Sequence, residues 1–317
     1  MLDAHQLKVF LTAAETLNFT HAAKRMHMTQ PSISQHINSL EKTFGLPLFV
    51  RKGRQLELTG AGLALVPLAR EMTQLSSHIE ETMESLKGEV SGHLLVSCST
   101  TPGKYVLPRL LAQFHDKYPQ VRATCEVTGQ DLAMQMLQQG QVHISLCSAE
   151  QVSPEVQKEA EFHDFFYDYI SLVVRHDHPW AQRESIEPHE LYQEKYIMRE
   201  ANSGTYHLVY EKLRSLEIDP GKLNVLLTLG NSEAIAIAVQ NGLGVGFVSN
   251  IILAYLTPKE VVPIRVRGLE MKRLIYIGRQ TKRPATLAQS AFWEFLQTYQ
   301  VRQFEIPAGQ LPAVKHI

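Results

Sequence analysis

The stretch MTQPSISQHINSLE, residues 28–41, concentrates side chains that can form hydrogen bonds with a partner molecule. At 100° per residue, one helical face carries apolar side chains and is expected to pack on the protein core: Ile33, Ile37, Leu40 and Phe44. The opposite face and its flanks carry mainly amides and hydroxyls: Gln30, Pro31, Ser32, Ser34, Gln35, Asn38 and Ser39, with one cation, Lys42. Glutamine can pair with adenine through two hydrogen bonds, and serine can donate or accept. These residue types favour a face that reads DNA bases over an ordinary solvated face.

A basic hairpin is expected directly after this helix. The segment PLFVRKGRQLELT alternates apolar and polar residues, which predicts two short strands with Lys52-Gly53-Arg54 at the tip. Arg51 and Arg54 would contact DNA phosphates or the minor groove, a contribution that does not depend on base sequence. Residues 20–54 carry six Lys and Arg against a single Asp or Glu, whereas the whole chain has a net charge of −1. A basic head on an acidic body predicts a polyanionic partner, commonly nucleic acid.

Local signals place two shorter helices before the polar-faced helix. Apolar residues at helical spacing in HQLKVFLTAAETL predict the first, and Thr20 is the expected N-cap of a second over residues 21–26. Thr29 can cap the polar-faced helix, and Pro31 suits its first turn. Helix, turn, helix and basic hairpin together predict a winged helix-turn-helix domain over residues 1–58.

Residues 59–91 are expected to form a long linker helix that Thr59 caps. Apolar residues recur there every seven positions with a second set between them, a pattern typical of a coiled-coil seam over about three heptads. At ~1.5 Å per residue the helix would be roughly 40 Å long. The alternative is a helix that packs on its own domain, but this length favours a dimer. The predicted dimerisation residues are Leu65, Met72, Leu75, Ile79 and Leu86.

From residue 92 the chain alternates between strand-like and helix-like segments. HLLVSCS, VRATCEVT and VHISLCS are expected to be strands, and a similar alternation runs from YDYISLVVR to VGFVS. Repeated βα units predict parallel sheets with helices on both faces, and this length favours two sheets over one. The tail, residues 301–317, is expected to be a loose appendage.

Hydroxyls and amides gather at corresponding helix starts in the two halves of this body. Side chains beside the free N–H groups of a helix N-terminus can hold an anion, aided by the helix dipole. In open parallel sheets, ligands bind at the carboxyl ends of the strands. Plain N-caps are the alternative for each residue alone, and the matching positions in both halves are the argument for a small-anion site. Its predicted residues are Ser99, Thr100, Thr101, Ser148, Asn202, Ser203 and Thr205.

The segment FTHAAKRMHMTQPSISQHINSLEKTFGLPLFVRKGRQLELTGAG resembles the DNA-binding domain of LysR-type transcriptional regulators. The resemblance covers residues 2–88 and rests on the motifs AA at 22–23, TQPSIS at 29–34, LE at 40–41, G-x-x-LF at 45–49 and LT-x-x-G at 58–62. In that family the residues that match Gln30, Pro31, Ser34 and Gln35 are the usual base and backbone readers. Many members carry Arg at the position of Gln35, so the base preference of relatives does not carry over there.

The body, close to 200 residues, resembles the effector domain of the same family. The resemblance implies a periplasmic-binding-protein-like fold of two Rossmann-like subdomains, joined by two crossing strands, with a cleft between them. We expect the effector domain over 92–300, with subdomain I at 92–163 plus 268–300 and subdomain II at 164–267. The segment STTPGKYVLPRLLAQF looks closest to the regulators of cysteine synthesis and carbon fixation, which suggests a small anion or phosphorylated metabolite as effector.

The combined interpretation is a cytoplasmic regulator that binds double-stranded DNA at an interrupted inverted repeat and responds to a small effector. The resemblance also implies a homotetramer built from dimers, and an effect on the access of RNA polymerase. An effector would act by binding one arrangement of the subdomains better than the other. No apolar run is long enough for a membrane span, and we expect no metal, no cofactor and no enzymatic activity.

Two alternatives use other features of the chain. Cys98, Cys125 and Cys147 lie near the carboxyl ends of successive strands, so a sheet ordered 2-1-3 would place Cys98 between the other two. A redox- or metal-responsive regulator would use this cluster, whereas small buried hydrophobes are the simpler interpretation. A more distant alternative is a solute-binding protein without DNA contact, which predicts an export signal and no basic head; the N-terminus lacks such a signal.

Overall fold

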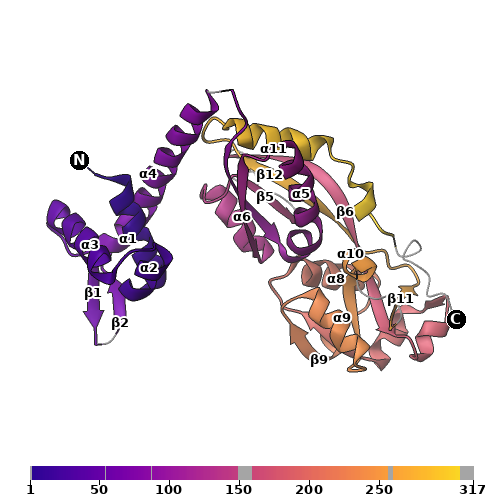
Figure 1. The fold of residues 1–317 in the computed structure, drawn as a ribbon. Helices are drawn as coiled ribbons and strands as arrows, with labels where there is room; N and C mark the ends of the chain where they lie inside the picture. Colours follow the sequence, from indigo (N-terminus) through magenta and orange to yellow (C-terminus); the bar gives the residue numbers. More distant parts are fainter. Residues whose placement is uncertain (1, 54, 87, 149–158, 256–259, 308–317) are drawn as a thin grey trace. The chain divides into compact units, whose positions relative to one another are not determined.

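The computed structural model describes residues 2–53, 55–86, 88–148, 159–255 and 260–307 (Figure 1). The chain divides into two compact units, residues 1–89 and 90–317. The first unit is a helical head with a two-stranded hairpin and a long helix, and the second is an α/β body. This order of elements confirms the predicted fold class. Among the described helices, none combines the length and the apolarity that a bilayer span needs.

The head contains α1 (Ala4–Thr16), α2 (Phe19–Arg25), α3 (Gln30–Phe44), β1 (Phe49–Lys52) and β2 (Gln55–Leu58). Their apolar faces share one core, to which α3 contributes Ile33, Ile37 and Leu40. Burial of each of these side chains contributes about 1.5–3 kcal/mol to the stability of the head. Phe44, which the periodicity also assigns to the core, is exposed because it is the last residue of α3.

Side chains at the helix ends determine where α2 and α3 begin. Thr20 is the predicted cap of α2, but Asn18 caps it instead: its Oδ1 accepts a hydrogen bond from the N–H of Thr20 at 2.9 Å. An N-cap needs an extended backbone, which Asn18 has, whereas Thr20 already lies within the helix. Thr29 caps α3 as predicted by accepting from the N–H of Ser32 at 3.3 Å, and Gly45 ends α3 with φ of +68°.

The long helix α4 (Gly60–Ser85) begins with the predicted cap, because Thr59 Oγ1 accepts a hydrogen bond from the N–H of Gly62 at 3.0 Å. Its first half packs on the core of the head, where Ala69 is fully buried and both Leu65 and Met72 make contact. Two of the predicted seam residues are therefore at least partly covered by their own domain. Further apolar side chains on this helix and just beyond it are exposed: Leu68, Leu75, Ile79, Met83 and Leu86.

The first half of the body is built on β3 (Gly92–Ser99), β4 (Val121–Thr128), β5 (Ile144–Ser148) and β12 (Lys272–Gln280), with the start of β6 (Ala160–Arg175). The strand order is β4-β3-β5-β12-β6, and β3 runs parallel to both β4 and β5. The helical elements of this half are η1 (Pro102–Val106), α5 (Leu107–Lys117), α6 (Gln130–Gln138) and α11 (Leu287–Thr298).

The second half continues the same sheet through the end of β6, β10 (Val245–Ser249), β8 (Lys195–Arg199) and β9 (Asn224–Leu229). Strand β11 (Val261–Val266) pairs with β6 and with the short β7 (Ser185–Ile186). The helices are α8 (Gly204–Ser215), α9 (Ser232–Gln240) and α10 (Asn250–Tyr255), with 3₁₀ turns at Pro179–Gln182, Pro188–Gln193 and Pro220–Lys222. Parallel pairing of β8 with β9 and β10 confirms the predicted βα units. The expectation of two separate, parallel sheets is wrong, because β6 and β12 pair antiparallel with their neighbours and join the strands of both halves in one order.

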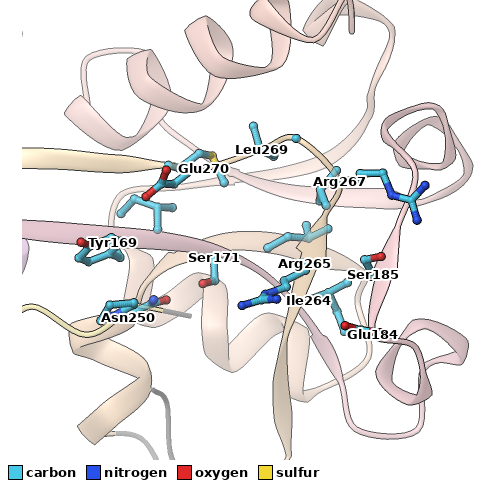
Figure 2. Close-up of a pocket in the computed structure, with 16 residues that line it drawn as sticks. Tyr169, Ser171, Glu184, Ser185, Asn250, Ile264, Arg265, Arg267, Leu269 and Glu270 are labelled. Carbon is cyan, nitrogen blue, oxygen red and sulfur yellow. The ribbon is translucent and has the colours of Figure 1, made fainter. Parts of the chain in front are cut away.

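Strand β6 crosses from one half to the other. Its residues up to Tyr169 pair with β12, whereas those from Ile170 onward pair with β10 and β11. The subdomain boundary drawn from the sequence, between residues 163 and 164, falls inside this strand and before its change of neighbours. Figure 2 shows the crossing point, where Tyr169 and Ser171 of β6 lie near Asn250 of α10.

The prediction of a loose tail is wrong for residues 301–306. The turn η5 (Val301–Phe304) places Phe304 in the core of the first half. Glu305 then accepts a hydrogen bond from the N–H of Tyr167 at 2.9 Å, and the carbonyl of Ile306 accepts one from Asn250 Nδ2 at 2.7 Å. Periodicity did not reveal this segment, because one aromatic side chain and two hydrogen bonds hold it. Residues 308–317 lie outside the described residues.

Candidate functional site

A groove of about 620 Å³ runs along the exposed face of α3. Its lining consists of Gln30, Pro31, Ser34, Gln35, Asn38, Ser39 and Lys42. The buried face of the same helix contains Ile33, Ile37 and Leu40, so the amides and hydroxyls that the sequence singled out share one accessible surface. Ser32 is half-buried beside this groove, at the capped first turn.

A carboxylate fixes the hairpin to the end of α3. Glu41 Oε1 accepts hydrogen bonds from the N–H groups of Leu48 and Phe49, at 2.7 and 3.2 Å. In the sequence analysis Glu41 appears only as part of a family motif, and its structural role depends on its contact with the chain beyond Gly45. The hairpin exposes Arg51, which has no ion-pair partner within the described residues, whereas Lys52 pairs with Glu57 at 2.7 Å. Arg54 lies outside the described residues.

The predicted effector residues come together from both halves of the body. Ser99, Thr100 and Thr101 follow β3, and Ser148 ends the neighbouring strand β5. In the other half, Ser203 caps α8 by accepting from the N–H of Tyr206 at 3.1 Å, and Asn202 is exposed in the preceding turn. Thr101 is buried, and within the described part of the chain no hydrogen-bond partner exists for the hydroxyls of Thr100 and Thr101.

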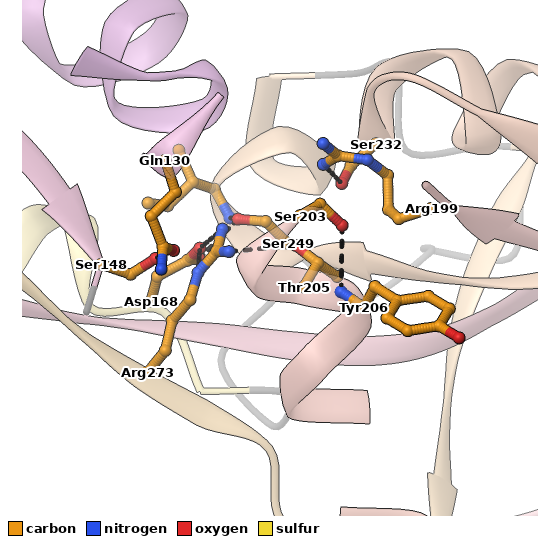
Figure 3. Close-up of polar contacts among 11 residues, drawn as sticks. Gln130, Ser148, Asp168, Arg199, Ser203, Thr205, Tyr206, Ser232, Ser249 and Arg273 are labelled. Atoms are coloured by element: carbon orange, nitrogen blue, oxygen red, sulfur yellow. Dashed lines mark hydrogen bonds and ion pairs between the residues drawn. The ribbon is translucent and has the colours of Figure 1, made fainter. Parts of the chain in front are cut away.

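The two halves touch directly at the start of α8. Ser148 Oγ donates to Gln130 Oε1 at 2.5 Å (Figure 3). Gly204 lies against both side chains. A side chain at position 204 would overlap the amide end of Gln130, which would have to move. The space between Arg199, Thr205 and Tyr206 is too small for a water molecule. Gly204, at the N-terminus of α8, is therefore a point of contact between the two halves.

A partly buried arginine connects the crossing strands to this contact. Arg273 Nε and Nη2 donate to Asp168 Oδ2 at 3.0 and 2.7 Å, and Nη1 donates to Thr205 Oγ1 at 3.0 Å (Figure 3). Asp168 is fully buried, and its other oxygen accepts from Ser249 Oγ at 2.5 Å. Sequence reasoning missed this network, because only the pairing of β12 with β6 sets Arg273 opposite Asp168. No local pattern distinguishes this arginine from the others.

Further charged groups lie at the N-terminus of α9. Arg199, at the end of β8, is buried; it donates to Ser232 Oγ at 3.2 Å and forms two hydrogen bonds of 2.7 Å with Glu200. Burial raises the pKa of Glu200, but the hydrogen bonds from Arg199, a backbone hydrogen bond and the charge of Arg199 together outweigh burial and hold the pKa below its usual value. Ser232 is the first residue of α9, and its contact with Arg199 joins distant segments that no local pattern connects.

An ion pair also joins the two halves near α9. Lys104 of η1 pairs with Glu233 of α9 at 2.8 Å. Beside it, burial together with the charge of Glu233 and a hydrogen bond to that residue raises the pKa of Tyr105 to about 12. Cationic side chains thus lie at the N-termini of α8 and α9, and each cation already has a carboxylate partner. A ligand anion would have to compete with or join these pairs.

The three cysteines have the predicted order but not the properties of a reactive cluster. The order β4-β3-β5 places Cys98 on the central strand of the three. Burial, with smaller contributions from the other two cysteines, raises the pKa of Cys98; burial also raises the pKa of Cys125, and that of Cys147 to about 11. Thiols with raised pKa remain protonated and are poor nucleophiles and metal ligands. Among the described residues, no group of His, Cys, Asp and Glu is arranged to hold a metal ion.

Comparison with known proteins matches both units of the chain. The model of the bacterial regulatory helix-turn-helix protein, lysR family, matches residues 4–63, and that of the LysR substrate binding domain matches residues 87–300. The RuBisCO operon transcriptional regulator of Allochromatium vinosum is 31% identical over 298 residues, which cover 93% of this chain and 95% of that protein.

Two solved structures are similar in fold. Full-length CbnR, complexed with its target DNA, has a TM-score of 0.69 and 22% identity, over 93% of this chain and 99% of that one. The CcmR regulatory domain of Synechocystis PCC6803, in complex with 2-PG, has a TM-score of 0.59 and 24% identity, over 71% of this chain and 99% of that one. At these identities the two likenesses concern the fold alone.

Proposed function

The chain belongs to the LysR family of transcriptional regulators, and from that membership we propose that it reads an interrupted inverted repeat in double-stranded DNA through the exposed face of α3. The observation that carries the proposal is the groove along α3, whose lining of amides and hydroxyls is exposed while the apolar face is buried. A recognition helix in the major groove presents this kind of surface to base edges.

Each side chain of this face has a distinct proposed role. Gln30 and Gln35 form paired hydrogen bonds with bases, and each good pair contributes about 1–3 kcal/mol of discrimination against the wrong base. Ser34 and Asn38 complete the contacts with bases and sugar–phosphate. Arg51 binds phosphate, which adds affinity without sequence preference. A DNA-reading role is consistent with the predicted cytoplasmic location.

The exposed apolar side chains of α4 support pairing with a second copy of the chain. Leu68, Leu75, Ile79 and Leu86 follow heptad spacing, and their exposure in the single chain leaves a seam that a second helix would cover. Leu65 and Met72 contribute less to this seam, because they contact the core of the head. The proposed dimer sets two heads on two half-sites.

The sheet edges of the body support further association into a tetramer. Strands β4 and β9 end the strand order, and β9 exposes Val225, Leu226 and Leu227 on both of its faces. An edge strand with unpaired backbone groups and exposed apolar side chains is suited to pairing with another copy. We include contact with RNA polymerase in the proposal on the basis of the family alone.

A small anion bound between the halves of the body is the proposed effector. The free hydroxyls of Thr100 and Thr101, the N-terminus of α8 and the guanidinium groups of Arg199 and Arg273 support this chemistry. Entry of a ligand beside Gly204 would separate the halves, since they are in contact there. The ligand would thereby favour one arrangement over the other, which is what an allosteric effector requires. The complex of CcmR with 2-PG is in keeping with a phosphorylated small acid.

Fluorescence anisotropy with a duplex from upstream of the protein's own operon tests the DNA-reading face. Gln35→Ala should weaken binding about 5- to 150-fold, the equivalent of about 1–3 kcal/mol, on the specific duplex and far less on a scrambled one. Thr43→Ala, on the same helix but outside the groove, is the matched control. Equal affinity of Gln35→Ala and wild type for the specific duplex, with the circular dichroism unchanged, would refute the assigned role.

Calorimetric titration tests the effector cleft with phosphoglycolate, 3-phosphoglycerate and inorganic sulfate as probes. Thr101→Val keeps the volume of the side chain and removes its hydroxyl, and Ser203→Ala removes the cap of α8. Each should weaken binding of the best probe about tenfold, because each removes a hydrogen bond to or beside an anion. Undiminished binding to both variants would place the effector elsewhere.

A further inference from the structure

A second pocket, of about 440 Å³, lies on the second half of the body where β6 crosses between the halves (Figure 2). Its walls come from β6 at residues 169–172, from β7 and β11, and from the segment 267–271 that leads into β12. Asn250, at the start of α10, also lines it. The residues before Tyr169 and Asn250, namely Asp168 and Ser249, belong instead to the network of Arg273. The pocket is therefore adjacent to that network but distinct from the proposed effector cleft.

Asn250 presents a buried acceptor without a donor in this pocket. The side chain is fully buried, and its Nδ2 donates to the carbonyl of Ile306 at 2.7 Å. Of the side-chain polar atoms in the described residues that are fully shielded from solvent, only this Oδ1 has no hydrogen-bond partner. Leaving such an atom unsatisfied costs about 1–3 kcal/mol, so native proteins rarely do so without a reason. A ligand with an O–H or N–H group would satisfy it.

Two more polar side chains face the same space. Ser171 is 5% exposed, and its hydroxyl has no hydrogen-bond partner within the described part of the chain. Arg265, on β11, has no ion-pair partner there either, and Figure 2 shows its guanidinium directed toward Ser171. Arg267, by contrast, pairs with Glu187 at 2.8 Å and points away from the pocket in the same view. Arg265 and Ser171 thus form a donor set for a carboxylate.

We propose that this pocket binds a small organic acid that carries a hydroxyl or ammonium group in addition to its carboxylate. The carboxylate accepts hydrogen bonds from Arg265 and Ser171, and the hydroxyl or ammonium group donates to Asn250 Oδ1. The volume lies within the usual range of small-molecule sites. The lining is mixed: Ile264 and Leu269 are apolar, and the carboxylates of Glu184 and Glu270 favour a ligand that carries a donor group beside its carboxylate. Hydroxy acids and amino acids share this chemistry.

The position of the pocket gives such a ligand a route to regulation. Its walls include the residues at which β6 changes neighbours, and the N–H of Ile170 donates to the carbonyl of Met271, just before β12, at 2.9 Å. A ligand that fits one arrangement of the two crossing strands better than another shifts the equilibrium between those arrangements. This regulatory consequence rests on the proposed function, whereas the binding of the acid does not.

Calorimetric titration of the full-length protein tests the pocket with three probes: D-glycerate, L-serine and propionate. We expect glycerate or serine to bind, and propionate, which lacks the second donor, to bind at least about tenfold more weakly. The preferred probe distinguishes a hydroxy acid from an amino acid. Failure of both glycerate and serine to bind at concentrations up to about 10 mM would overturn the proposal.

Substitutions locate the binding. Arg265→Gln and Ser171→Ala should each weaken the preferred probe about tenfold, while Arg214→Gln, an exposed arginine outside the pocket, should leave its affinity unchanged. Equal affinity of wild type, Arg265→Gln and Ser171→Ala would also overturn the proposal. The cleft variant Thr101→Val should retain full affinity for the probe. The DNA affinity of Arg265→Gln is also measured without any ligand. This measurement distinguishes failure of the pocket proposal from failure of the proposed function.

Discussion

Replacing Arg273 with methionine should destabilise the body strongly, because it removes the charge that compensates Asp168. The two nitrogens of Arg273 lie 3.0 and 2.7 Å from Asp168 Oδ2, and the Asp168 side chain is fully buried. Methionine preserves most of the apolar volume, and Ser249 still donates to the carboxylate but cannot neutralise it. Removing one partner of a buried ion pair costs about 3–5 kcal/mol, since the other charge stays in a medium of low dielectric constant.

Tryptophan fluorescence during urea unfolding measures this loss selectively. The chain has two tryptophans, Trp180 and Trp293, and they are buried in the separate cores of the two halves of the body. The head contains none, so the signal reports on the body alone. With a slope of about 2–3 kcal/mol per molar urea, a loss of about 3–5 kcal/mol lowers the midpoint by about 1–2.5 M.

The control is an exposed ion pair of the same body. Arg267 and Glu187 are 71% and 40% exposed, so solvent screens their attraction and Arg267→Met should leave the midpoint nearly unchanged. The double variant Asp168→Asn with Arg273→Met should be more stable than Arg273→Met alone, because it buries no uncompensated charge. A midpoint of Arg273→Met equal to that of Arg267→Met would refute the reasoning.

Three further outcomes are expected. Ile79→Glu should raise the dissociation constant of the dimer at least about 100-fold in sedimentation analysis, since an unpaired carboxylate in an apolar seam costs several kcal/mol; an unchanged dimer would rule out the seam. Iodoacetamide at pH 8 should leave Cys147 and Cys98 unmodified by mass spectrometry, because burial raises the pKa of Cys147 to about 11 and the reactive thiolate forms only as pH approaches that value; rapid labelling would contradict this. Arg51→Ala should lower the slope of log affinity against log salt by about one while preserving sequence preference, and an unchanged slope would exclude a phosphate contact.

The DNA-reading helix could be predicted from the sequence because the signals that define it are local. A period of 3.6 residues separates Ile33 and Ile37 from the polar face, and Thr29 and Gly45 set the ends through their own backbone and side-chain geometry. Local signals were ambiguous where two neighbours suit the same role, as with Asn18 and Thr20 at the start of α2. Helical periodicity also assigns Phe44 to the core, although this last residue of α3 is exposed.

The sequence predicts only in part which apolar residues of α4 are available to pair with a second helix. Its heptad pattern is visible in the sequence, but the pattern does not distinguish a second chain from the head's own core as the surface that covers each residue. Packing in the head decides that Leu65 and Met72 make contact with that core, while Ile79 and Leu86 remain exposed. The burial of Phe304 likewise could not be predicted, because no periodic pattern of apolar residues includes it.

The sequence by itself determined the helical head, the separation of apolar and polar faces on its third helix, and the alternation of strands and helices in the body. Only the tertiary structure decided which charges and acceptors meet. Arg273 and Asp168 are 105 positions apart, and the register of β12 on β6 joins them. Asn250 is likewise an ordinary asparagine in the sequence, and folding leaves its Oδ1 buried in a pocket without a donor. Both features depend on contacts between distant segments, and local periodicity and capping carry no information about such contacts.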